Sequence, residues 1–508
     1  MYKNSSLHCN ILLAFILLVC VDSNAQVISS WVKRDKDNHL EYYKDSLGNR
    51  IPDFSAVGYH FGKKTFPEGN IVASISPNGI DDTNPLQKLI DSVSKLPITV
   101  IPKVILLKKG TYTVSSTINI NSSSLIIRGE GSNENGTVVN FIATKQSDLF
   151  NIEGHGKIDI NKNRGREITD KYVPVGATQF HVKSASSFSI NQKVVVNRVP
   201  NDDWIHAIQM DNIQGLREGS KNWSANGFSL SYERIITDID KSTGLITINA
   251  PIVMAMDVKY GENTLIPYSF EGRITEVGVE NLRLNSSFTT DTDEQHGWVA
   301  VRIAAAENCW VQNVLSVHFG LSCVNIASSA KNCTVRNCTC LDPISIITGG
   351  RRYSFNCDGQ LNLFQNCTAR NGRHDFATGA RVCGPNVFSY CNATLVHADI
   401  GPHHRWATGT LYDNIISDGA INAQDRGNWG SGHGWSGAYQ VFWNCSSLTA
   451  AIQNPPMAYN WNIGYKGTND GAKLVRPNGV WEATNVGGVK PKSLYDAQEA
   501  EKSELLVK

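Results

Sequence analysis

The feature that most constrains the fold of this chain is an internal repeat with a base period of about 24 residues. In the second half of the chain, a segment of three residues recurs, and its middle residue is Asn (Tyr390 in one copy). The third residue of the segment falls at positions 282, 314, 338, 367, 391, 415 and 445. Successive positions differ by 32, 24, 29, 24, 24 and 30. A constant period interrupted by loop insertions is typical of a stacked solenoid, in which each repeat contacts only its neighbours.

The residues of the repeats favour strands over helices. Runs such as Cys333–Arg336 and Val441–Trp443 are short, β-rich and separated by Gly and Asn, with no amphipathic helix among them. We therefore expect an all-β protein, a right-handed parallel β-helix whose coils stack at about 4.8 Å. The solenoid is expected over residues 75–465. Residues 160–270 depart from the coil rhythm and predict an inserted β-rich segment that walls one side of a cleft.

The cysteines follow the same rhythm. Ten of the twelve lie between Cys309 and Cys445, and the members at 338, 367, 391 and 445 share one offset, directly after the row of Asn. We interpret them as small apolar thiols buried inside the solenoid, beside Asn at turns. One or more disulfides are the alternative. The spacing does not match a zinc site, so no metal centre is expected.

Residues 1–25 have the features of a signal peptide. Lys3 supplies a positive start, residues 11–19 are apolar, and residues 23–25 end in the small residue that a signal peptidase requires. We expect a secreted or periplasmic protein, with lipid anchorage at Cys20 as the alternative. No other stretch is long and apolar enough to cross a membrane, and a net charge of +1 argues against a nucleic-acid partner.

A second fold signal follows an N-terminal extension over residues 26–74. Gly79-Ile80-Asp81-Asp82-Thr83 precedes a helix expected over Asn84–Leu96, which Asp82 or Thr83 can cap and which covers the end of the solenoid. Gly110-Thr111-Tyr112 comes next. This order resembles the start of pectate-lyase-like β-helix proteins, a superfamily whose fold hosts polysaccharide lyases, glycoside hydrolases, epimerases and phage spikes. Residues 466–508 are expected to cap or trail the solenoid.

Arginine and histidine gather in the second half of the expected solenoid. Residues 343–465 contain seven Arg and five His but no Lys, which favours two-pronged recognition of carboxylate or sulfate groups. Arg352, Arg381 and Arg405 stand at one and the same offset after a Cys of the repeat, at 338, 367 and 391, so stacking predicts a ladder of arginines on one face. The alternative is a row of solvated arginines paired with neighbouring aspartates.

The densest cluster is Gly401-Pro402-His403-His404-Arg405-Trp406. In a strand, His403 would point with Arg405, and His404 with Trp406. A His beside an Arg has a lowered pKa and stays neutral, so it can accept a proton.

A glycine-rich surface loop is expected over residues 425–437. Its two Trp are placed to stack on sugar rings, with packing against the solenoid as the alternative. The expected substrate-binding residues are Arg352, Arg381, His374, Trp429, Trp435 and Arg426.

These residue types suit β-elimination at a uronic acid. That reaction requires neutralisation of the C6 carboxylate, a base for the C5 proton and an acid for the leaving O4. The expected catalytic residues are His403, His404, Arg405, Tyr353 and His433. Arginine neutralises the carboxylate, one of the adjacent His is the base, and the acid is the Tyr or His433.

The chain is thus expected to be a monomeric polysaccharide lyase acting on an anionic, sulfated polysaccharide of ulvan or glycosaminoglycan type. No cofactor is expected, and calcium is not favoured, because the aspartates of this region are spread over separate coils. A polygalacturonase-like glycoside hydrolase is one alternative. Gly432-His433-Gly434 fits it, but the coils lack paired aspartates. A non-catalytic carbohydrate-binding surface protein is the other alternative.

Overall fold

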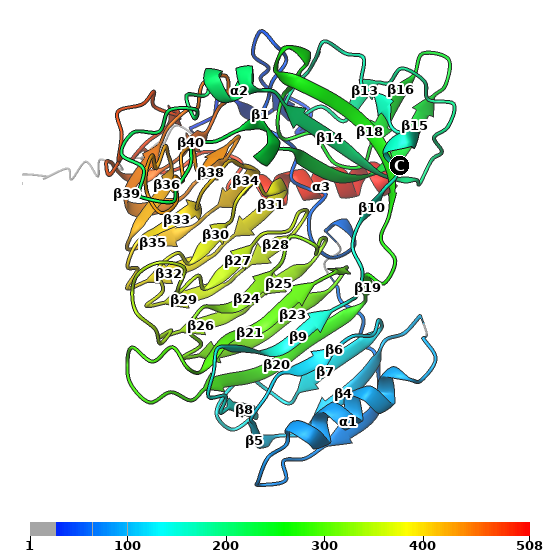
Figure 1. The fold of residues 1–508 in the computed structure, drawn as a ribbon, viewed down its shortest axis with the longest axis vertical. Coiled ribbons are helices and arrows are strands. Elements are labelled where there is room, and N and C mark those ends of the chain that lie inside the picture. The colour runs from blue at the N-terminus through cyan, green and yellow to red at the C-terminus, as the bar shows by residue number, and fades with distance from the viewer. Residues whose placement is uncertain (1–26, 63–64, 99, 508) are drawn as a thin grey trace, which may run out of the picture.

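The computed structural model describes residues 27–62, 65–98 and 100–507, and one long parallel sheet winds through most of them (Figure 1). Each strand pairs in parallel with the strand at the same offset one coil later. Val335, for example, pairs with Phe364, and Phe364 pairs in turn with Phe388 on the next coil. This is the register of a parallel β-helix, so the predicted fold class is confirmed. The expected signal peptide and Cys20 lie outside the described residues.

The coils present three faces. The first contains β3 (Asn70–Ile75), β4 (Lys103–Leu107), β7 (Leu125–Gly129), the first halves of β20 (Val277–Ser286) and β23 (Trp310–Val317), β25 (Thr334–Arg336), β28 (Leu363–Gln365), β31 (Cys383–Ser389), β34 (Ala407–Asp413), β37 (Gly437–Ala438), β38 (Val441–Trp443), β40 (Trp461–Ile463) and β42 (Val480–Glu482). The second contains β5 (Gly110–Val114), β8 (Thr137–Phe141), the second halves of β20 and β23, β26 (Thr339–Leu341), β29 (Thr368–Arg370), β32 (Asn392–Thr394) and β35 (Ile416–Ser417). The third contains β6 (Ile118–Ile120), β9 (Ser147–Glu153), β21 (Gly297–Ala304), β24 (Ser322–Ile326), β27 (Phe355–Cys357), β30 (Phe376–Thr378), β33 (Asp399–Pro402), β36 (Ala420–Ala423), β39 (Ser446–Ile452) and β41 (Lys466–Asn469).

The recurring Asn forms the turn between the first and second faces. Asn281, Asn313, Asn337 and Asn366 all have φ between 53° and 60°, the left-handed conformation that Asn tolerates better than most residues. Their side-chain amides also bond along the stack, with Asn313 donating to Asn281 at 2.9 Å. The period read from the sequence is therefore the period of this turn.

The interior is filled by the residues that the repeat places there. All ten described cysteines are free, and nine of them are buried, so the interpretation as buried thiols is confirmed for them. Beside them the rings of Phe364, Phe388, Tyr412 and Phe442 stack on successive coils at centroid distances of 4.7 to 5.4 Å. Offset aromatic stacking of this kind rigidifies the core.

Helix α1 (Thr83–Ser94) covers the N-terminal end of the solenoid, as predicted, and buries Leu86, Ile90 and Val93 against the first coil. The predicted capping by Asp82 is wrong. Asp82 stands at the N-cap, but its carboxylate accepts hydrogen bonds from the backbone N–H groups of Asn78 and Thr113 and makes no cap bond. The carboxylate thus fastens the helix entry to the neighbouring coil.

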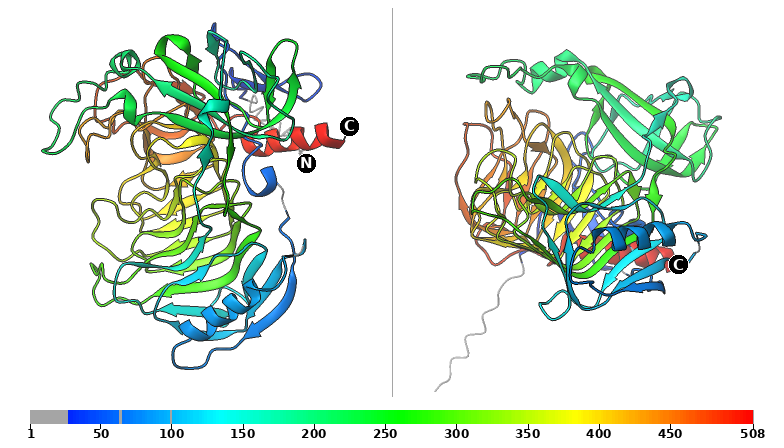
Figure 2. Two further views of the ribbon diagram at one scale, coloured as in Figure 1. Left: turned by 45° about the vertical axis from the view of Figure 1, so that its right-hand side comes forward. Right: turned by 60° about the horizontal axis from the view of Figure 1, so that its bottom comes forward.

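The predicted insertion is an antiparallel β-unit at the C-terminal end of the solenoid, opposite α1 (Figures 1 and 2). It contains β10 (Asp159–Ile160), β11 (Arg166–Glu167), β12 (Tyr172–Val173), β13 (Gln179–His181), β14 (Lys193–Pro200), α2 (Asp202–Ala207), β15 (Leu230–Asp240), β16 (Leu245–Ile248), β17 (Met256–Asp257) and β18 (Gly261–Ser269), and β19 (Ile274–Thr275) leads back to the coils, where it pairs with β22 (Ala306–Glu307).

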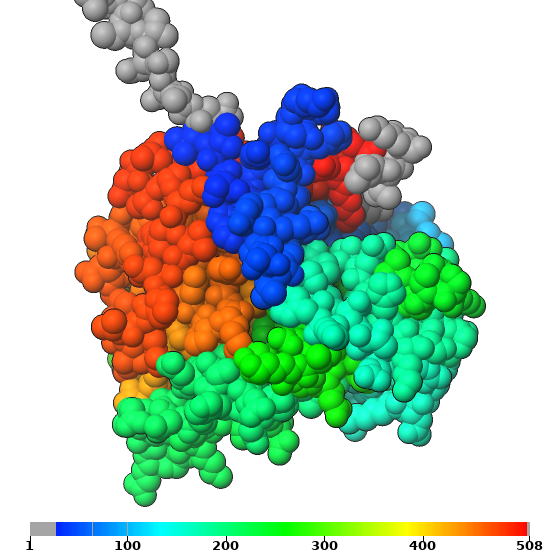
Figure 3. All heavy atoms as spheres, turned by 90° about the horizontal axis from the view of Figure 1, so that it is seen from above, coloured from blue at the N-terminus to red at the C-terminus, as the bar shows by residue number. Residues whose placement is uncertain are grey.

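The two ends of the described chain pack together on the solenoid. The N-terminal extension, with β1 (Val32–Arg34) and β2 (Leu40–Tyr42), is seated between the last coils and the insertion (Figure 3). Helix α3 (Leu494–Val507) contacts both β2 and β34. Within the described part of the chain, no helix is long and apolar enough to cross a membrane.

Candidate active site

The predicted catalytic residues come together over the third face, where successive coils carry β27, β30 and β33. Tyr353 and His374 hold equivalent positions on neighbouring coils, because Phe355 pairs with Phe376. His403 follows β33 on the next coil, and its Nε2 lies 3.0 Å from the Tyr353 hydroxyl. The bond links two coils, and His374 on the coil between them packs against both rings.

Three more imidazoles surround His403. Its ring centroid lies 4.3 Å from that of His374, 5.2 Å from that of His404 and 5.1 Å from that of His433. His433 arrives from the long loop between β36 and β37, and its ring lies 5.0 Å from that of His404. We call Tyr353 and these four His the aromatic cluster.

The imidazoles of the cluster are held neutral. Burial lowers the pKa of His404 to about 4, and the nearby Arg405 and Arg426 contribute. Burial also lowers the pKa of His433 to about 3, with His404 and Arg426 as further causes. The pKa of His403 is lowered in the same way, first by burial. Neutral imidazoles are proton acceptors at pH 7.

Tyr353 has the opposite role in proton transfer. Burial raises the pKa of its hydroxyl to about 12. The hydroxyl therefore keeps its proton and can donate it, while His403 at 3.0 Å can accept or return a proton. The pair couples a proton donor to a proton acceptor.

Two of the three arginines of the expected ladder are adjacent. The backbone N–H of Arg381 donates to the carbonyl of Arg405 at 2.9 Å, so the two residues occupy equivalent places on neighbouring coils. Their guanidinium groups donate to uncharged groups, at Gly227 and Ser431. Neither forms an ion pair with a described carboxylate, so the alternative of arginines neutralised by aspartates does not apply to this pair.

The placement of Arg352 in the ladder is wrong. The loop inserted in its coil moves Arg352 to the other end of the third face, where its backbone carbonyl accepts from Arg373 and His374. Its guanidinium is buried and donates to Ser345 and to the carbonyl of Asn371. Equal spacing from Cys338 does not give equal position, because the insertion falls between the two residues.

Two other expected substrate contacts, His374 at the base of the cluster and Arg426 below it, are sealed from solvent. His374 and Arg426 are each 2% exposed, and both bind Asp399: Nδ1 of His374 lies 3.2 Å from its carboxylate, and Arg426 forms an ion pair with it. We therefore assign both to support of Tyr353 and His403 rather than to contact with a glycan.

Asp399 is the residue that sequence reasoning did not place in the site. Burial opposes its ionisation, but Arg426 and His374 hold its pKa well below the usual range. The carboxylate fixes the orientation of His374, which packs against His403. Its signal in the sequence is an acidic residue four positions before His403, in a segment that otherwise reads as a buried strand.

The two Trp of the glycine-rich loop have different places. Trp435 is 1% exposed and donates to the carbonyl of Ile208, so the expectation that it stacks on sugar is wrong. Trp429 is 37% exposed, so part of its ring can meet a sugar. The strand alternation expected for residues 403–406 is also wrong, because β33 ends at Pro402 and Trp406 turns inward against Trp204.

The insertion closes one side of the site. Its segment 202–228 lies over the loop that carries His433, with hydrogen bonds from Trp223 to Gly432 and from Asn428 to Gly215. Arg381 is held by the same segment through Gly227. Among the described residues, no group of three or more His, Cys, Asp or Glu is arranged to hold a metal ion.

The fold and this site define a parallel β-helix protein with a partly buried cluster of Tyr, His and Arg on one face of its coils. Neither a scan against models of protein families nor a search of curated proteins finds a match.

Solved structures with a similar fold include the tailspike protein gp49 of Pseudomonas phage LKA1, at 11% identity and a TM-score of 0.40 over 81% of this chain and 72% of that one. An alginate lyase from Paenibacillus sp. str. FPU-7 has 9% identity and a TM-score of 0.39 over 81% of this chain and 99% of that one. An iota-carrageenase complexed to iota-carrageenan fragments has 8% identity and a TM-score of 0.34, over 81% and 60% of the two chains. Identities and TM-scores this low support no inference about the activity of this chain. The parallel β-helix is assigned from the register of its strands.

Proposed function

We propose that this chain is a polysaccharide lyase that cleaves a uronate-containing polysaccharide by β-elimination at the aromatic cluster. The observation that carries the proposal is the 3.0 Å contact between the hydroxyl of Tyr353 and a neutral His403, beside Arg381 and Arg405. An acid, a base and cations for a carboxylate are the groups that this reaction requires.

The roles follow from the charges. Arg381 and Arg405 bind the C6 carboxylate and stabilise the negative charge that develops when C5 loses its proton. His404, next to these arginines and neutral, takes the C5 proton. The C4–O4 bond then breaks as the C4–C5 double bond forms, and Tyr353 protonates O4. His404 then releases the C5 proton to water, and Tyr353 regains a proton from water, while His403 accepts the hydrogen bond that orients the Tyr353 hydroxyl.

Substrate binding also improves the base. The pKa of His404 is lowered partly by the two arginines. A bound carboxylate offsets their charge and raises the pKa of His404 toward neutrality, where a general base is most effective. The site thus becomes more basic only when an anionic sugar occupies it.

The carboxylates beside the cluster do not suit a glycoside hydrolase, which needs two carboxyl groups flanking the scissile bond. Asp399 is tied to Arg426 and His374. Asp375 is buried and accepts a hydrogen bond from Ser354 at 2.5 Å. Neither has access to a sugar.

The pair Arg381 and Arg405 and the exposed ring of Trp429 also indicate the class of substrate. One guanidinium can bind a carboxylate through two hydrogen bonds, so the pair Arg381 and Arg405 has donors for a sulfate ester on the same or the next sugar as well as for the C6 carboxylate. We therefore place a sulfated uronate polymer, of ulvan or glycosaminoglycan type, first among the substrates.

Incubation with ulvan, chondroitin sulfate, alginate and polygalacturonate tests the proposal. We expect ultraviolet absorbance of a 4,5-unsaturated product from at least one polymer, unchanged by a chelator.

Tyr353→Phe should lower kcat by about 100- to 10,000-fold with a small effect on KM. The control is Tyr390→Phe, the same change at the turn between the first and second faces. Reducing ends without the absorbance would show hydrolysis, and glycan binding without either signal would show a non-catalytic protein.

A further inference from the structure

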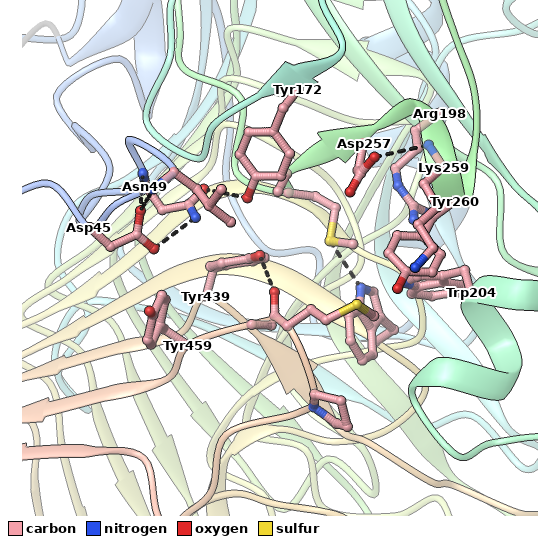
Figure 4. A pocket seen from close by; sticks show the side chains of 17 residues that line it. Asp45, Asn49, Tyr172, Arg198, Trp204, Asp257, Lys259, Tyr260, Tyr439 and Tyr459 are labelled. Atoms are coloured by element: carbon pink, nitrogen blue, oxygen red, sulfur yellow. Dashed lines mark hydrogen bonds between the residues drawn. The ribbon is translucent and has the colours of Figure 1, made fainter.

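A pocket of about 400 Å³ opens where the N-terminal extension, the insertion and the last coils meet. Figure 3 shows these three segments in contact on one face, and Figure 4 shows the pocket itself. Aromatic and charged side chains gather in it. They include Arg198, Trp204, Asp257, Lys259, Tyr260 and Trp406. In Figure 4 Arg198, Trp204, Lys259 and Tyr260 stand at one end, and Asp45, Asn49 and Tyr459 at the other.

Arg198 is the unusual member of this group. It is 2% exposed, yet its Nη1 has no hydrogen-bond partner. Within the described part of the chain its guanidinium forms no ion pair, and it lies over the face of Trp204 at 4.5 Å. Burial lowers its pKa to about 10, so the group is still charged at neutral pH.

A second buried arginine in the same insertion shows what a structural arginine looks like here. Arg234 is 1% exposed and donates to the carbonyls of Glu233, Ala250, Pro251 and Gly384. Its donors are satisfied by the fold, whereas Nη1 of Arg198 is not. Asp257 favours the charged form but forms no ion pair with Arg198. A buried charge with an unsatisfied donor destabilises a protein, so its retention beside an open pocket points to a partner that binds there.

The rest of the pocket describes that partner. Trp204 and Tyr260 offer aromatic faces, and the carboxylate of Asp257 can accept from sugar hydroxyls. Lys259 adds a second positive charge near the mouth, over the ring of Tyr260 at 5.0 Å. The volume of the pocket is in the range of small-ligand sites, so the pocket can hold one sugar unit rather than a polymer segment.

We propose that this pocket is a second carbohydrate site, which binds a single sugar unit through an oxyanion, a carboxylate or a sulfate, held by Arg198. The site is separate from the aromatic cluster, and the inference does not depend on the proposed lyase activity.

Calorimetric titration tests the proposal, with sodium D-glucuronate, D-galactose 6-sulfate, neutral D-galactose and sodium sulfate as probes. We expect at least one acidic sugar to bind at least tenfold more tightly than D-galactose, and the stronger of the two identifies the oxyanion. Quenching of tryptophan fluorescence should follow the same curve, because Trp204 and Trp406 line the pocket. Sodium sulfate binding as tightly as both sugars would overturn the sugar part of the proposal, and no binding by either sugar would overturn all of it.

Variants separate a ligand-binding arginine from a structural one. Arg198→Met should weaken sugar binding at least tenfold and raise the thermal midpoint of the free protein, because an unpaired buried charge is removed. Arg234→Met, the matched control, should lower the midpoint, because four carbonyls lose their donor. Tyr260→Ala should weaken binding with the fold intact. A lower midpoint for Arg198→Met with unchanged affinity would show a structural role and overturn the proposal.

Discussion

At the scale of single residues, the candidate site depends on imidazoles that stay neutral. Burial and neighbouring cations act in the same direction on His404 and His433, and both pKa values fall well below the usual value for His. The protein does not offset these cations with carboxylates within the cluster, apart from Asp399 beneath it. The described cluster therefore carries positive charge that an anionic substrate, as proposed, would offset.

The acid limb of the pH profile tests this arrangement. The proposed base, His404, can accept a proton only while neutral, and its pKa is lowered to about 4, so kcat/KM should be level from neutral pH to about pH 5 and fall near pH 4. Arg381 lowers this pKa. Arg381→Gln should therefore move the fall to higher pH by several tenths of a unit, besides weakening substrate binding.

The control for this profile is Arg370→Gln. Arg370 lies outside the cluster in an ion pair with Asp342, so its removal should not move the limb. An acid limb centred near pH 6.5 in the wild type, or one that does not respond to Arg381→Gln, would assign the base to a residue other than His404.

Part of this site was predictable from the sequence, and the reason is physical. Residues within one turn, such as His403 and Arg405, are neighbours whatever the alignment of successive coils. Positions across coils follow only while the period holds, and the loop before Arg352 breaks it. Burial is the least visible property, because Trp435 and Trp429 have the same sequence setting, yet the insertion covers only Trp435.

At the scale of the element, the turn between the first two faces sets the register of every coil. Its Asn residues serve twice, through their left-handed backbone and through the amide stack. The sequence revealed this turn because its left-handed geometry favours Asn, which stands at six of the seven repeats, with Tyr390 at the other. No residue type is fixed in this way in the long insertions, so the sequence predicts the positions of their strands only approximately.

Substitution of Asn337 separates the two roles of the turn. Asn337→Ala places a Cβ-bearing residue without a polar group at φ 54° and removes the amide that donates to Asn313. It should destabilise the fold by about 1–2 kcal/mol. Asn337→Gly loses the same hydrogen bond but relaxes the backbone, and should be closer to wild type. Thermal midpoints measure both variants. Equal losses would mean that the amide stack, and not the left-handed conformation, controls stability.

At the scale of the whole molecule, the two ends of the described part of the chain are joined across the solenoid. Helix α3 reaches back to the first face, and the N-terminal extension lies against it through Gln498, which donates to the carbonyl of Pro52. The pocket of Arg198 has the N-terminal extension as one wall. Packing of the chain ends therefore bears on that pocket, as well as on the stability of the last coils.

Asp413 is the residue that connects these parts. It is fully buried at the end of β34, and its carboxylate accepts from the hydroxyl of Ser493 at 2.6 Å and from the backbone N–H of Tyr495 at 2.9 Å. Asp413→Ala leaves both donors buried and unpaired, which costs about 1–3 kcal/mol each. We expect α3 to be released, its C-terminal segment to be cut first in limited proteolysis, and the thermal midpoint to fall.

The matched control is Glu504→Ala, an exposed acidic residue on the same helix, which should leave the proteolysis pattern unchanged. Asp413→Asn retains one oxygen as an acceptor and should give an intermediate result. Because α3 also braces the N-terminal extension, its release in Asp413→Ala should weaken binding of an acidic sugar in the pocket of Arg198, although no residue of that pocket has changed. Unaltered proteolysis in Asp413→Ala would mean that the hydrophobic contacts of Leu494 and Tyr495 alone hold the helix in place.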